Sequence, residues 1–414
     1  MSNAQKKNVP ELRFSGFEDE WEEKKLGNLG LFQKSYSFSR AKEGNGKTKH
    51  IHYGDIHSKF KTVLDSDGNI PNIIEKAVFE LIQKGDIVFA DASEDYSDLG
   101  KAVMIDFKPN SLISGLHTHL FRPLNNAISN FLIFYTKTLS YKKFIRQQGT
   151  GISVLGISKK SLLNLNVLIP RSGQEQQKIG KFFSKLDRQI ELEEQKLELL
   201  QQQKKGYMQK FFSQELRFKD ENGEEYPEWE EKQLGEVAEI IGGGTPSTKN
   251  KLYWNGEINW FSPIEIGNKT YVYSSQKKIT EEGLRKSSAK ILPVGTILFT
   301  SRAGIGKTAI LAKESTTNQG FQSIVPRKGV LDSYYVYTIS NILKILAEKV
   351  SAGSTFSEIS KKQMEQLNLN IPMIKEQKNI SKFFSKFDNL IEIQERKLKL
   401  LKQQKQGLLQ KMFI

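Results

Sequence analysis

The sequence predicts an α+β fold: two globular mixed α/β domains separated by two long helices that pair as an antiparallel coiled coil, with an internal pseudo-twofold repeat. Three observations support this prediction: a helical stretch that occurs twice, shorter motifs that repeat with it, and intervening stretches that share little. The helical stretch covers residues 182–212 and 383–413, at a constant offset of 201 residues, with 19 of 31 positions identical. A repeat of this length indicates that the chain contains the same architectural unit twice.

Apolar residues in both helices recur at alternating spacings of three and four, the pattern of a coiled-coil seam. Each seam has two polar interruptions, Glu193 and Lys204 in the first helix and Gln394 and Lys405 in the second. An antiparallel register that pairs Glu193 with Lys405 and Lys204 with Gln394 keeps these residues together. A shift by one heptad would press each of them against an apolar residue. We therefore predict this register, which also pairs Leu197 with Leu401 and Leu200 with Leu398.

Shorter motifs give the domain boundaries. Residues 21–27 recur at 229–235, and Ile169-Pro170 returns as Ile371-Pro372 just before each long helix. Residues 85–90 correspond to 295–300, and both are typical of a buried strand after a turn. We predict a first globular domain at 1–172, a spacer helix at 173–213, a second globular domain at 214–373 and a second spacer helix at 374–414. At 1.5 Å per residue, each repeated helix would span roughly 45–50 Å.

Composition favours a polyanionic partner. Lysine and arginine total 62 against 47 acidic residues, which gives a net charge of +15 and a pI of about 9.4. The absence of cysteine excludes disulfides, thiolate zinc sites and a cysteine nucleophile. The sequence has neither the apolar core of a signal peptide nor a run of 18 apolar residues. We expect no association with membranes and a cytoplasmic location.

Two stretches, residues 31–83 and 236–292, share little although their surroundings repeat. A common scaffold with two different surfaces is typical of two binding sites of different specificity, the alternative being drift between functionless loops. Both stretches combine cationic, polar and aromatic residues, which suit phosphates, sugars and base edges. The glycines at 44, 46 and 242–244 are expected to let the backbone approach a ligand closely.

The candidate DNA-binding residues are the cationic, aromatic and polar side chains of these stretches and of the loops beside the predicted buried strands. In the first domain they are Arg40, Lys47, Lys49, His50, Tyr53, His57, Lys59, Asp91, Ser93, Tyr96, His117 and His119. In the second domain they are Thr245, Ser247, Lys249, Lys251, Tyr253, Trp254, Asn255, Trp260, Ser301, Arg302, Lys307, Gln319 and Phe321.

Several catalytic motifs are absent. Residues 301–308 end in Gly-Lys-Thr like a phosphate-binding loop, but Ser301 stands where that loop needs its first glycine. We predict a strand-turn-strand there, with Arg302 and Lys307 facing DNA. The His-x-His pairs could bind zinc, yet no cysteine supports them and the second domain has no histidine. Asp91 and the nearby acids suit cytosine amino groups or water better than catalysis. We therefore expect no catalytic residue and no metal site, and a chain that is not an enzyme.

Four further motifs indicate a protein family. They are residues 243–247 (Gly-Gly-Thr-Pro-Ser), 253–256 (Tyr-Trp-Asn-Gly), 318–321 (Asn-Gln-Gly-Phe), and a Glu-Gln pair at the start of each long helix. Over essentially its whole length the chain resembles the specificity (S) subunit of type I restriction–modification enzymes. The first domain departs from the pattern, with residues 114–119 (Ser-Gly-Leu-His-Thr-His) in place of 318–321.

The resemblance implies two target-recognition domains, each of which reads one half of a bipartite, asymmetric site in double-stranded DNA. It also implies that the helices dock two methyltransferase (modification) subunits, through which restriction subunits join. S-adenosylmethionine, ATP and magnesium would be bound by these partners, and no cofactor by this chain. A duplex repeats every roughly 34 Å, so a spacer of the predicted length would set two readers about one turn apart. The alternative is a stand-alone sequence-specific DNA-binding regulator.

Overall fold

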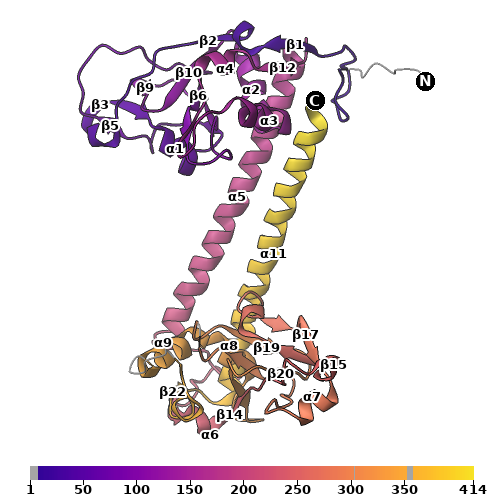
Figure 1. The fold of residues 1–414 in the computed structure, drawn as a ribbon. Coiled ribbons are helices and arrows are strands. Elements are labelled where there is room, and N and C mark those ends of the chain that lie inside the picture. Colours follow the sequence, from indigo (N-terminus) through magenta and orange to yellow (C-terminus); the bar gives the residue numbers. More distant parts are fainter. Residues whose placement is uncertain (1–7, 303, 352–357) are drawn as a thin grey trace. The chain divides into compact units, whose positions relative to one another are not determined.

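The computed structural model describes residues 8–302, 304–351 and 358–414 (Figure 1). The chain divides into two compact units, the first formed by residues 1–196 and 394–414 and the second by residues 197–393. Two long helices, α5 (Gly173–Phe212) and α11 (Ile374–Met412), nearly coincide with the predicted spacer helices. Each unit therefore contains a globular α/β part and a portion of both long helices. Within the described residues, no helix is both long and apolar enough to cross a membrane.

The first unit is built around a five-stranded sheet, whose central strands β6 (Ile87–Ala90) and β8 (Ala102–Ile105) are buried at every residue. In spatial order that sheet is β2 (Gly30–Phe32), β10 (Thr118–Pro123), β6, β8 and β4 (Val63–Leu64). The smaller sheets are β5 (Asn72–Ile73) with β3 (Glu43–Ile51) and β9 (Leu112–Ser114), β1 (Glu22–Lys25) with β12 (Asn166–Ile169), and β7 (Ala92–Ser93) with β11 (Leu155–Gly156). The short helices are η1 (Leu26–Asn28), η2 (Arg40–Lys42), α1 (Tyr53–Ser58), α2 (Asn126–Tyr135), α3 (Leu139–Gln148) and α4 (Lys159–Leu163).

The second unit repeats this topology. Its five-stranded sheet is β14 (Ala238–Gly242), β21 (Gln322–Pro326), β18 (Ile297–Phe299), β19 (Thr308–Leu311) and β16 (Tyr271–Val272). Its smaller sheets are β17 (Lys277–Ile279) with β15 (Trp254–Phe261) and β20 (Thr316–Thr317), and β13 (Glu230–Gln233) with β22 (Asn368–Ile371). Its short helices are α6 (Leu234–Val237), η3 (Lys251–Tyr253), η4 (Pro263–Glu265), α7 (Glu281–Arg285), α8 (Ser333–Thr338), α9 (Ser340–Ser351) and α10 (Lys361–Glu365).

The internal repeat predicted from sequence is confirmed by local geometry. Strand β1 pairs with β12 from Glu22 opposite Ile169, and β13 pairs with β22 from Glu230 opposite Ile371. The predicted buried strands are β6 and β18, and the glycine before each, Gly85 or Gly295, has a positive φ of 91° or 87°. That left-handed backbone explains why glycine occurs at both turns.

A buried glutamate anchors the start of each long helix. In the first unit Glu175, 1% exposed, accepts hydrogen bonds from Arg13 Nε (2.6 Å) and Nη2 (2.8 Å) and from Trp21 Nε1 (3.3 Å). A carboxylate in the first helical turn also suits the positive end of the helix dipole. The fork of the arginine supplies the paired charge that a buried carboxylate requires.

The second unit contains the same three-residue clamp. Glu376, fully buried, accepts from Arg217 Nε (3.2 Å) and Nη2 (2.8 Å) and from Trp229 Nε1 (3.2 Å). The glutamine after each glutamate donates to the carbonyl of the preceding proline: Gln176 to Pro170 at 2.7 Å and Gln377 to Pro372 at 2.8 Å. The Glu-Gln pair of the sequence is therefore structural, because it ties the helix to the strand before it.

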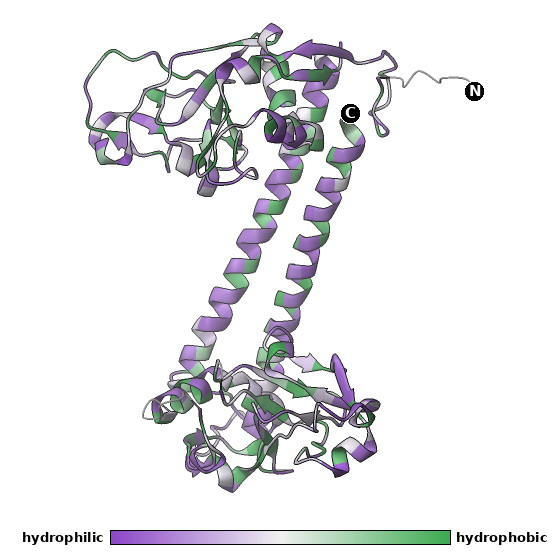
Figure 2. Cartoon of the chain, viewed as in Figure 1, coloured by the Kyte–Doolittle hydropathy of each residue, from purple (hydrophilic) through white to green (hydrophobic). Residues whose placement is uncertain are grey.

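The long helices run antiparallel inside each unit. In the first unit Phe183 packs on Phe413, with ring centroids 5.8 Å apart, and Glu193 bonds Gln394 at 2.7 Å. In the second unit Phe211 packs on Phe384 at 5.7 Å. All eight predicted seam residues are buried or half-buried, whereas most of their neighbours along the helices are exposed. Figure 2 shows the corresponding pattern, with hydrophobic residues at intervals along mostly hydrophilic helices.

The predicted register is wrong. Glu193 contacts Gln394 and Lys397 rather than Lys405, which pairs with Asp187 beside Leu186. In the second unit Lys204 pairs with Asp388 at 2.5 Å. Within each unit the offset from the predicted register is about one heptad. The predicted leucine pairs, Leu197 with Leu401 and Leu200 with Leu398, would join residues of different units and stay a prediction.

The physical reason is that both seam lysines find an aspartate beside the seam. Asp187 and Asp388 occupy equivalent positions in the two helices, and each forms an ion pair with a seam lysine. The lysines therefore need not face a polar seam residue, which leaves Gln394 to donate to Glu193.

The clamp predicts a matched pair of stability effects. Glu376→Gln should lower the free energy of unfolding by about 2–3 kcal/mol, because it removes the charge partner of a partly buried arginine. The control is Glu194→Gln, which breaks the exposed ion pair with Lys402 and should cost less than about 1 kcal/mol. Urea unfolding of both variants measures the difference, and equal losses would contradict the role of the clamp.

Candidate nucleic-acid interface

The two units place their dissimilar polar residues at the same edge of the five-stranded sheet. In the first unit, β6 ends at Ala90 and Asp91 follows, with the backbone carbonyl of Asp91 accepting from Ile157 N at 2.9 Å. In the second unit, Ser301 takes the equivalent place, and its carbonyl accepts from Ile359 N at 3.0 Å. The scaffold at this edge is therefore the same, and the side chains on it differ.

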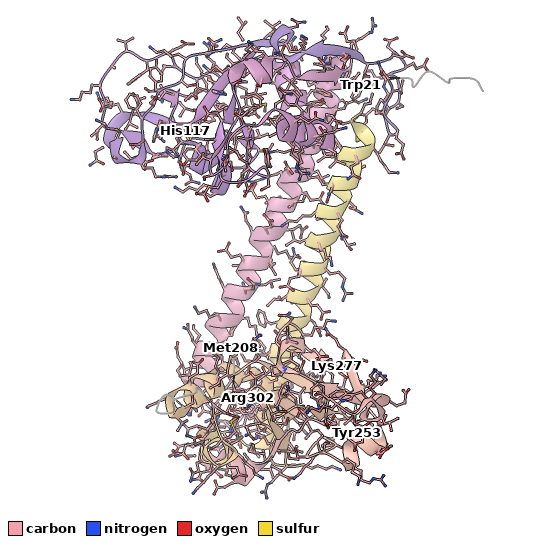
Figure 3. The ribbon with its side chains drawn as sticks, viewed as in Figure 1. Trp21, His117, Met208, Tyr253, Lys277 and Arg302 are labelled. Atoms are coloured by element: carbon pink, nitrogen blue, oxygen red, sulfur yellow. The ribbon has the colours of Figure 1, made fainter. Side chains whose placement is uncertain are left out.

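An aromatic cluster lies at this edge in the first unit. The ring of Tyr53 contacts His52, His57 and His117, with centroid distances of 4.6, 5.4 and 5.3 Å. We call these four residues the histidine–tyrosine cluster. Beside it, Asp91 Oδ1 lies 3.3 Å from His117 Nδ1 (His117 is labelled in Figure 3). The second oxygen of Asp91 lies 3.4 Å from His119 Nδ1.

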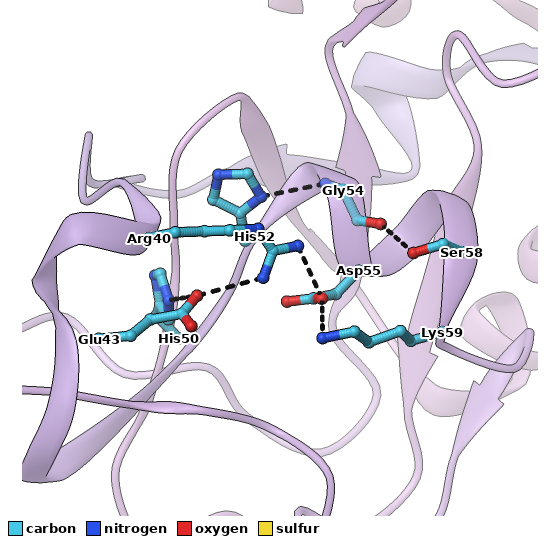
Figure 4. A network of polar contacts seen from close by, with 8 residues as sticks. All are labelled: Arg40, Glu43, His50, His52, Gly54, Asp55, Ser58 and Lys59. Carbon is cyan, nitrogen blue, oxygen red and sulfur yellow. Dashed lines mark hydrogen bonds and ion pairs between the residues drawn. The ribbon is translucent and has the colours of Figure 1, made fainter.

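A second polar network holds Arg40 in place (Figure 4). Arg40 Nη2 donates to Asp55 Oδ1 at 3.0 Å, and Lys59 Nζ lies 2.9 Å from the same oxygen. Glu43 lies between Arg40 and the buried His50. Burial would raise the pKa of Asp55, but the hydrogen bonds from Lys59 and Arg40 outweigh it and hold this pKa below its ordinary value. Arg40 remains half-exposed and is thus a positioned cation at the surface.

The second unit carries tryptophans instead of histidines. Trp254 and Trp260 pack edge to face, with centroids 5.0 Å apart, and Trp260 Nε1 donates to Gly244 O at 2.8 Å. Lys277 lies over the Trp254 ring at 5.9 Å, and Figure 3 labels Lys277 and Tyr253. Thr245 donates to Gln319, which links the residues after the glycine run to the turn before β21.

A pocket in the second unit combines cations with polar backbone. Its lining consists of Ser262, Pro263, Ile264, Arg302, Lys307, Asn318 and Gly320. Arg302 and Lys307 can both bind a phosphate, and arginine can also donate to a guanine edge. Arg302, labelled in Figure 3, comes from the turn between β18 and β19.

That turn settles the phosphate-loop question. A phosphate-binding loop leads from a strand into a helix, whereas residues 301–307 lead from β18 into β19. Thr300 Oγ1 donates to Gly304 O and accepts from Lys307 N, so the turn is closed by its own hydrogen bonds. The predicted strand-turn-strand is confirmed.

The glycines serve a different purpose from the predicted one. A Cβ on Gly244 would lie 2.3 Å from Ser288 Oγ and 2.4 Å from Ala289 N, and one on Gly46 would lie 1.5 Å from Ile73 O. These close approaches are to neighbouring protein segments rather than to an open surface. Gly46 and Gly244 are therefore needed for packing, whereas a Cβ on Gly242 would make only an ordinary contact of 3.7 Å with Gln322.

The predicted contact residues divide by exposure. Fully or nearly buried are His50, Ser93, Trp260, Ser301 and Phe321. We correct the prediction for these five, because their side chains have almost no exposed surface to offer. Exposed are Arg40, Lys47, Lys59, Tyr96, His117, Ser247, Lys249, Lys251, Asn255, Lys307 and Gln319. Half-buried are Lys49, Tyr53, His57, Asp91, His119, Thr245, Tyr253, Trp254 and Arg302.

The sequence analysis did not predict three residues that take part in these contacts: His52, Asp55 and Lys277. His52 caps α1 by accepting from Gly54 N at 3.1 Å and packs on Tyr53, and its His-x-His spacing could have indicated it. Asp55 and Lys277 had no such signal, because their roles depend on partners distant in sequence. Among the described residues, no group of three or more histidines and acids is arranged to hold a metal ion.

Comparison with known proteins identifies the family of this chain. A model of the type I restriction modification DNA specificity domain matches the chain twice, at residues 18–202 and 226–403. The chain belongs to this family. The family is the one that the sequence motifs resemble, and the relatives that match parts of the chain are named type I restriction enzyme specificity subunits.

Two curated relatives and one solved structure are similar to this chain. The MjaIX specificity subunit of Methanocaldococcus jannaschii is 39% identical over 198 residues, which cover 46% of this chain and 45% of that protein. The putative MjaX specificity subunit of the same organism is 27% identical over 371 residues, which cover 85% and 84%. The S subunit of M. genitalium shares the fold, with a TM-score of 0.63, 15% identity, and 98% and 99% of the two chains covered.

Acid should loosen the first unit selectively. Burial lowers the pKa of His50, His52, His57 and His119. The unfolded chain therefore takes up protons first as the pH falls below about 6.5, and folding stability decreases with it. The second unit contains no histidine.

Hydrogen exchange measured by mass spectrometry at pH 7.5 and 5.5, corrected for intrinsic rates, tests this expectation. Peptides from residues 43–58 should lose protection at pH 5.5, whereas peptides from residues 254–279 should keep theirs. Equal loss in both units would show that the histidines are not responsible.

Proposed function

We propose that the chain is the DNA-recognition subunit of a type I restriction–modification complex. In this proposal each unit reads one half of a bipartite asymmetric site, and the long helices dock two methyltransferase subunits, through which restriction subunits join. S-adenosylmethionine, ATP and magnesium belong to those partners, and the complex works in the cytoplasm, where the DNA lies.

The observation that carries the proposal is one scaffold with two dissimilar polar faces. The first unit presents the histidine–tyrosine cluster with Asp91 and Arg40, and the second presents Trp254, Arg302 and Lys307. Different side chains at one place in a repeated fold are suited to two different base sequences. The net charge of +15 suits the phosphate backbone and implies binding that weakens steeply with salt.

The long helices carry a repeated exposed stripe. On α5, Leu192 and Leu199 are 49% and 53% exposed, one heptad apart, and Gly206 follows one heptad later. On α11, Ile393 and Leu400 are 61% and 53% exposed, and Gly407 follows in the same way. A Cβ built on either glycine meets no atom within 4 Å, so the packing of this chain does not require glycine there.

Two equivalent stripes suit two copies of one partner. Exposed apolar residues at heptad spacing are typical of a face that packs against another helix, and a glycine allows the partner backbone to approach closely. We assign these stripes to the docking of the two methyltransferase subunits.

Exchange of one recognition surface tests the reading of half-sites. Replacement of residues 31–150 by the corresponding region of another family member should change only one half of the methylated sequence. Long-read sequencing of the host genome, which reports methylated adenines, measures the motif. An unchanged motif, or a change in both halves, would refute the assignment of one half-site to each unit.

Substitution of the stripe glycines tests the dock without risk to folding. Gly206→Leu and Gly407→Leu each add helix propensity, worth about 1 kcal/mol, and meet open space within this chain. Each should reduce co-purification of one methyltransferase subunit, and the double variant should lose both. The matched control is Gln201→Leu on α5, an exposed position about 140° around the helix from Gly206 and so outside the stripe. Unchanged stoichiometry in the glycine variants would show that these glycines are merely tolerated.

A further inference from the structure

His117 has a backbone conformation that a side chain normally disfavours. Its φ is +52°, in the left-handed region that only a few per cent of non-glycine residues adopt, histidine more often than most. The equivalent residue of the second unit is Gly320, because His117 O accepts from Asp91 N (3.0 Å) as Gly320 O accepts from Ser301 N (2.9 Å). The first unit thus keeps an imidazole at a turn where the repeat has no side chain.

The imidazole is both exposed and oriented. The His117 side chain is 51% exposed, its Nδ1 lies 3.3 Å from Asp91 Oδ1, and its ring meets Tyr53 edge to face. A carboxylate can only accept, so it holds the proton on Nδ1 and leaves Nε2 of the neutral ring as an acceptor. His119, on the other side of the same carboxylate, is 13% exposed and donates from Nε2 to Ile157 O at 3.0 Å. Its ring is therefore turned inward, and Asp91 directs His117 outward.

An outward-facing acceptor discriminates between bases. In the major groove adenine and cytosine present an amino group, whereas guanine and thymine present a keto oxygen at the corresponding place. Nε2 of His117 can accept from N6 of adenine or N4 of cytosine and is repelled by O6 or O4. In the second unit Gly320 lines a pocket together with the donors Arg302 and Lys307, which come from the neighbouring β18–β19 turn and suit guanine or phosphate.

We infer that His117 is a specificity-determining residue of the first unit, which selects an amino-bearing base at one position of its half-site through Nε2. Asp91 is a positioning residue, which sets the tautomer of His117. This inference rests on the proposed reading of one half-site by each unit.

The experiment uses the complex of this subunit with its methyltransferase subunits, assayed at one fixed pH throughout. The motif of the wild-type complex is mapped first. The methylated base is left unchanged. Every other adenine or cytosine of the half-site assigned to the first unit is then replaced, one at a time, by an analogue that lacks only the exocyclic amino group. At one position, loss of the amino group should slow methylation by the wild-type complex about tenfold, the effect of one base contact.

Two variants then test whether His117 is the residue that recognises this amino group. His117→Gly reproduces the residue of the second unit and relaxes the backbone, so it should fold, and it should methylate the natural and amino-free sites equally. Asp91→Asn can donate to Nδ1 and so turn Nε2 into a donor, which should shift the preference at that position from amino to keto bases. The matched control is Gln214→Gly, another exposed residue with φ of +60°, which should leave the tenfold discrimination intact.

The outcomes distinguish a failure of the role of His117 from a failure of the proposed function. A wild-type complex that fails to assemble or shows no bipartite motif would overturn the proposed function itself. A normal motif whose discrimination is unchanged in His117→Gly would overturn only the role of His117. If His117→Gly lowers base selectivity at one position of the half-site, but the wild-type complex methylates sites with amino-free bases at that position normally, the assignment of Nε2 as an acceptor is wrong.

Discussion

The buried glutamate at the start of each long helix is the interaction on which the rest of the structure depends. Glu175 and Glu376 each gather an arginine and a tryptophan from the segment before the domain and hold them against the first helical turn. A carboxylate without those donors could not stay buried. The clamp therefore joins the N-terminal segment of each repeat, its closing strand and its long helix into one packed body.

This arrangement separates the parts that must be the same from the parts that can vary. The clamp, the pairing of β1 with β12 and of β13 with β22, and the central strands are buried, so both units retain them. The residues that follow those central strands differ between the two units. Asp91 and Ser301 stand at the same place, yet Asp91 is half-buried and contacts two histidines, whereas Ser301 is fully buried.

Much of the fold was predictable, because the repeat and the periodicity of the helices are properties of local sequence. The candidate site was predictable only as a region. His50, Trp260 and Phe321 belong to residue types that often contact DNA, but burial depends on what packs above them. The run Gly242–Gly244 suggested a ligand loop, and its purpose became visible only from the distance between Gly244 and Ser288. Pairings such as Arg40 with Asp55 likewise depend on the fold of the connecting strand.

The sequence by itself determined that the chain is a duplicated scaffold with two long helices and two dissimilar polar surfaces, since periodicity, repeats and charge are written along the chain. Only the tertiary structure decided the register of those helices and the orientation of the side chains at the sheet edge. Both depend on partners that lie far apart in sequence: Asp187 satisfies Lys405, and Asp91 directs His117. The seam pattern in the sequence shows which residues are polar, but it does not show which neighbouring side chains will pair with them.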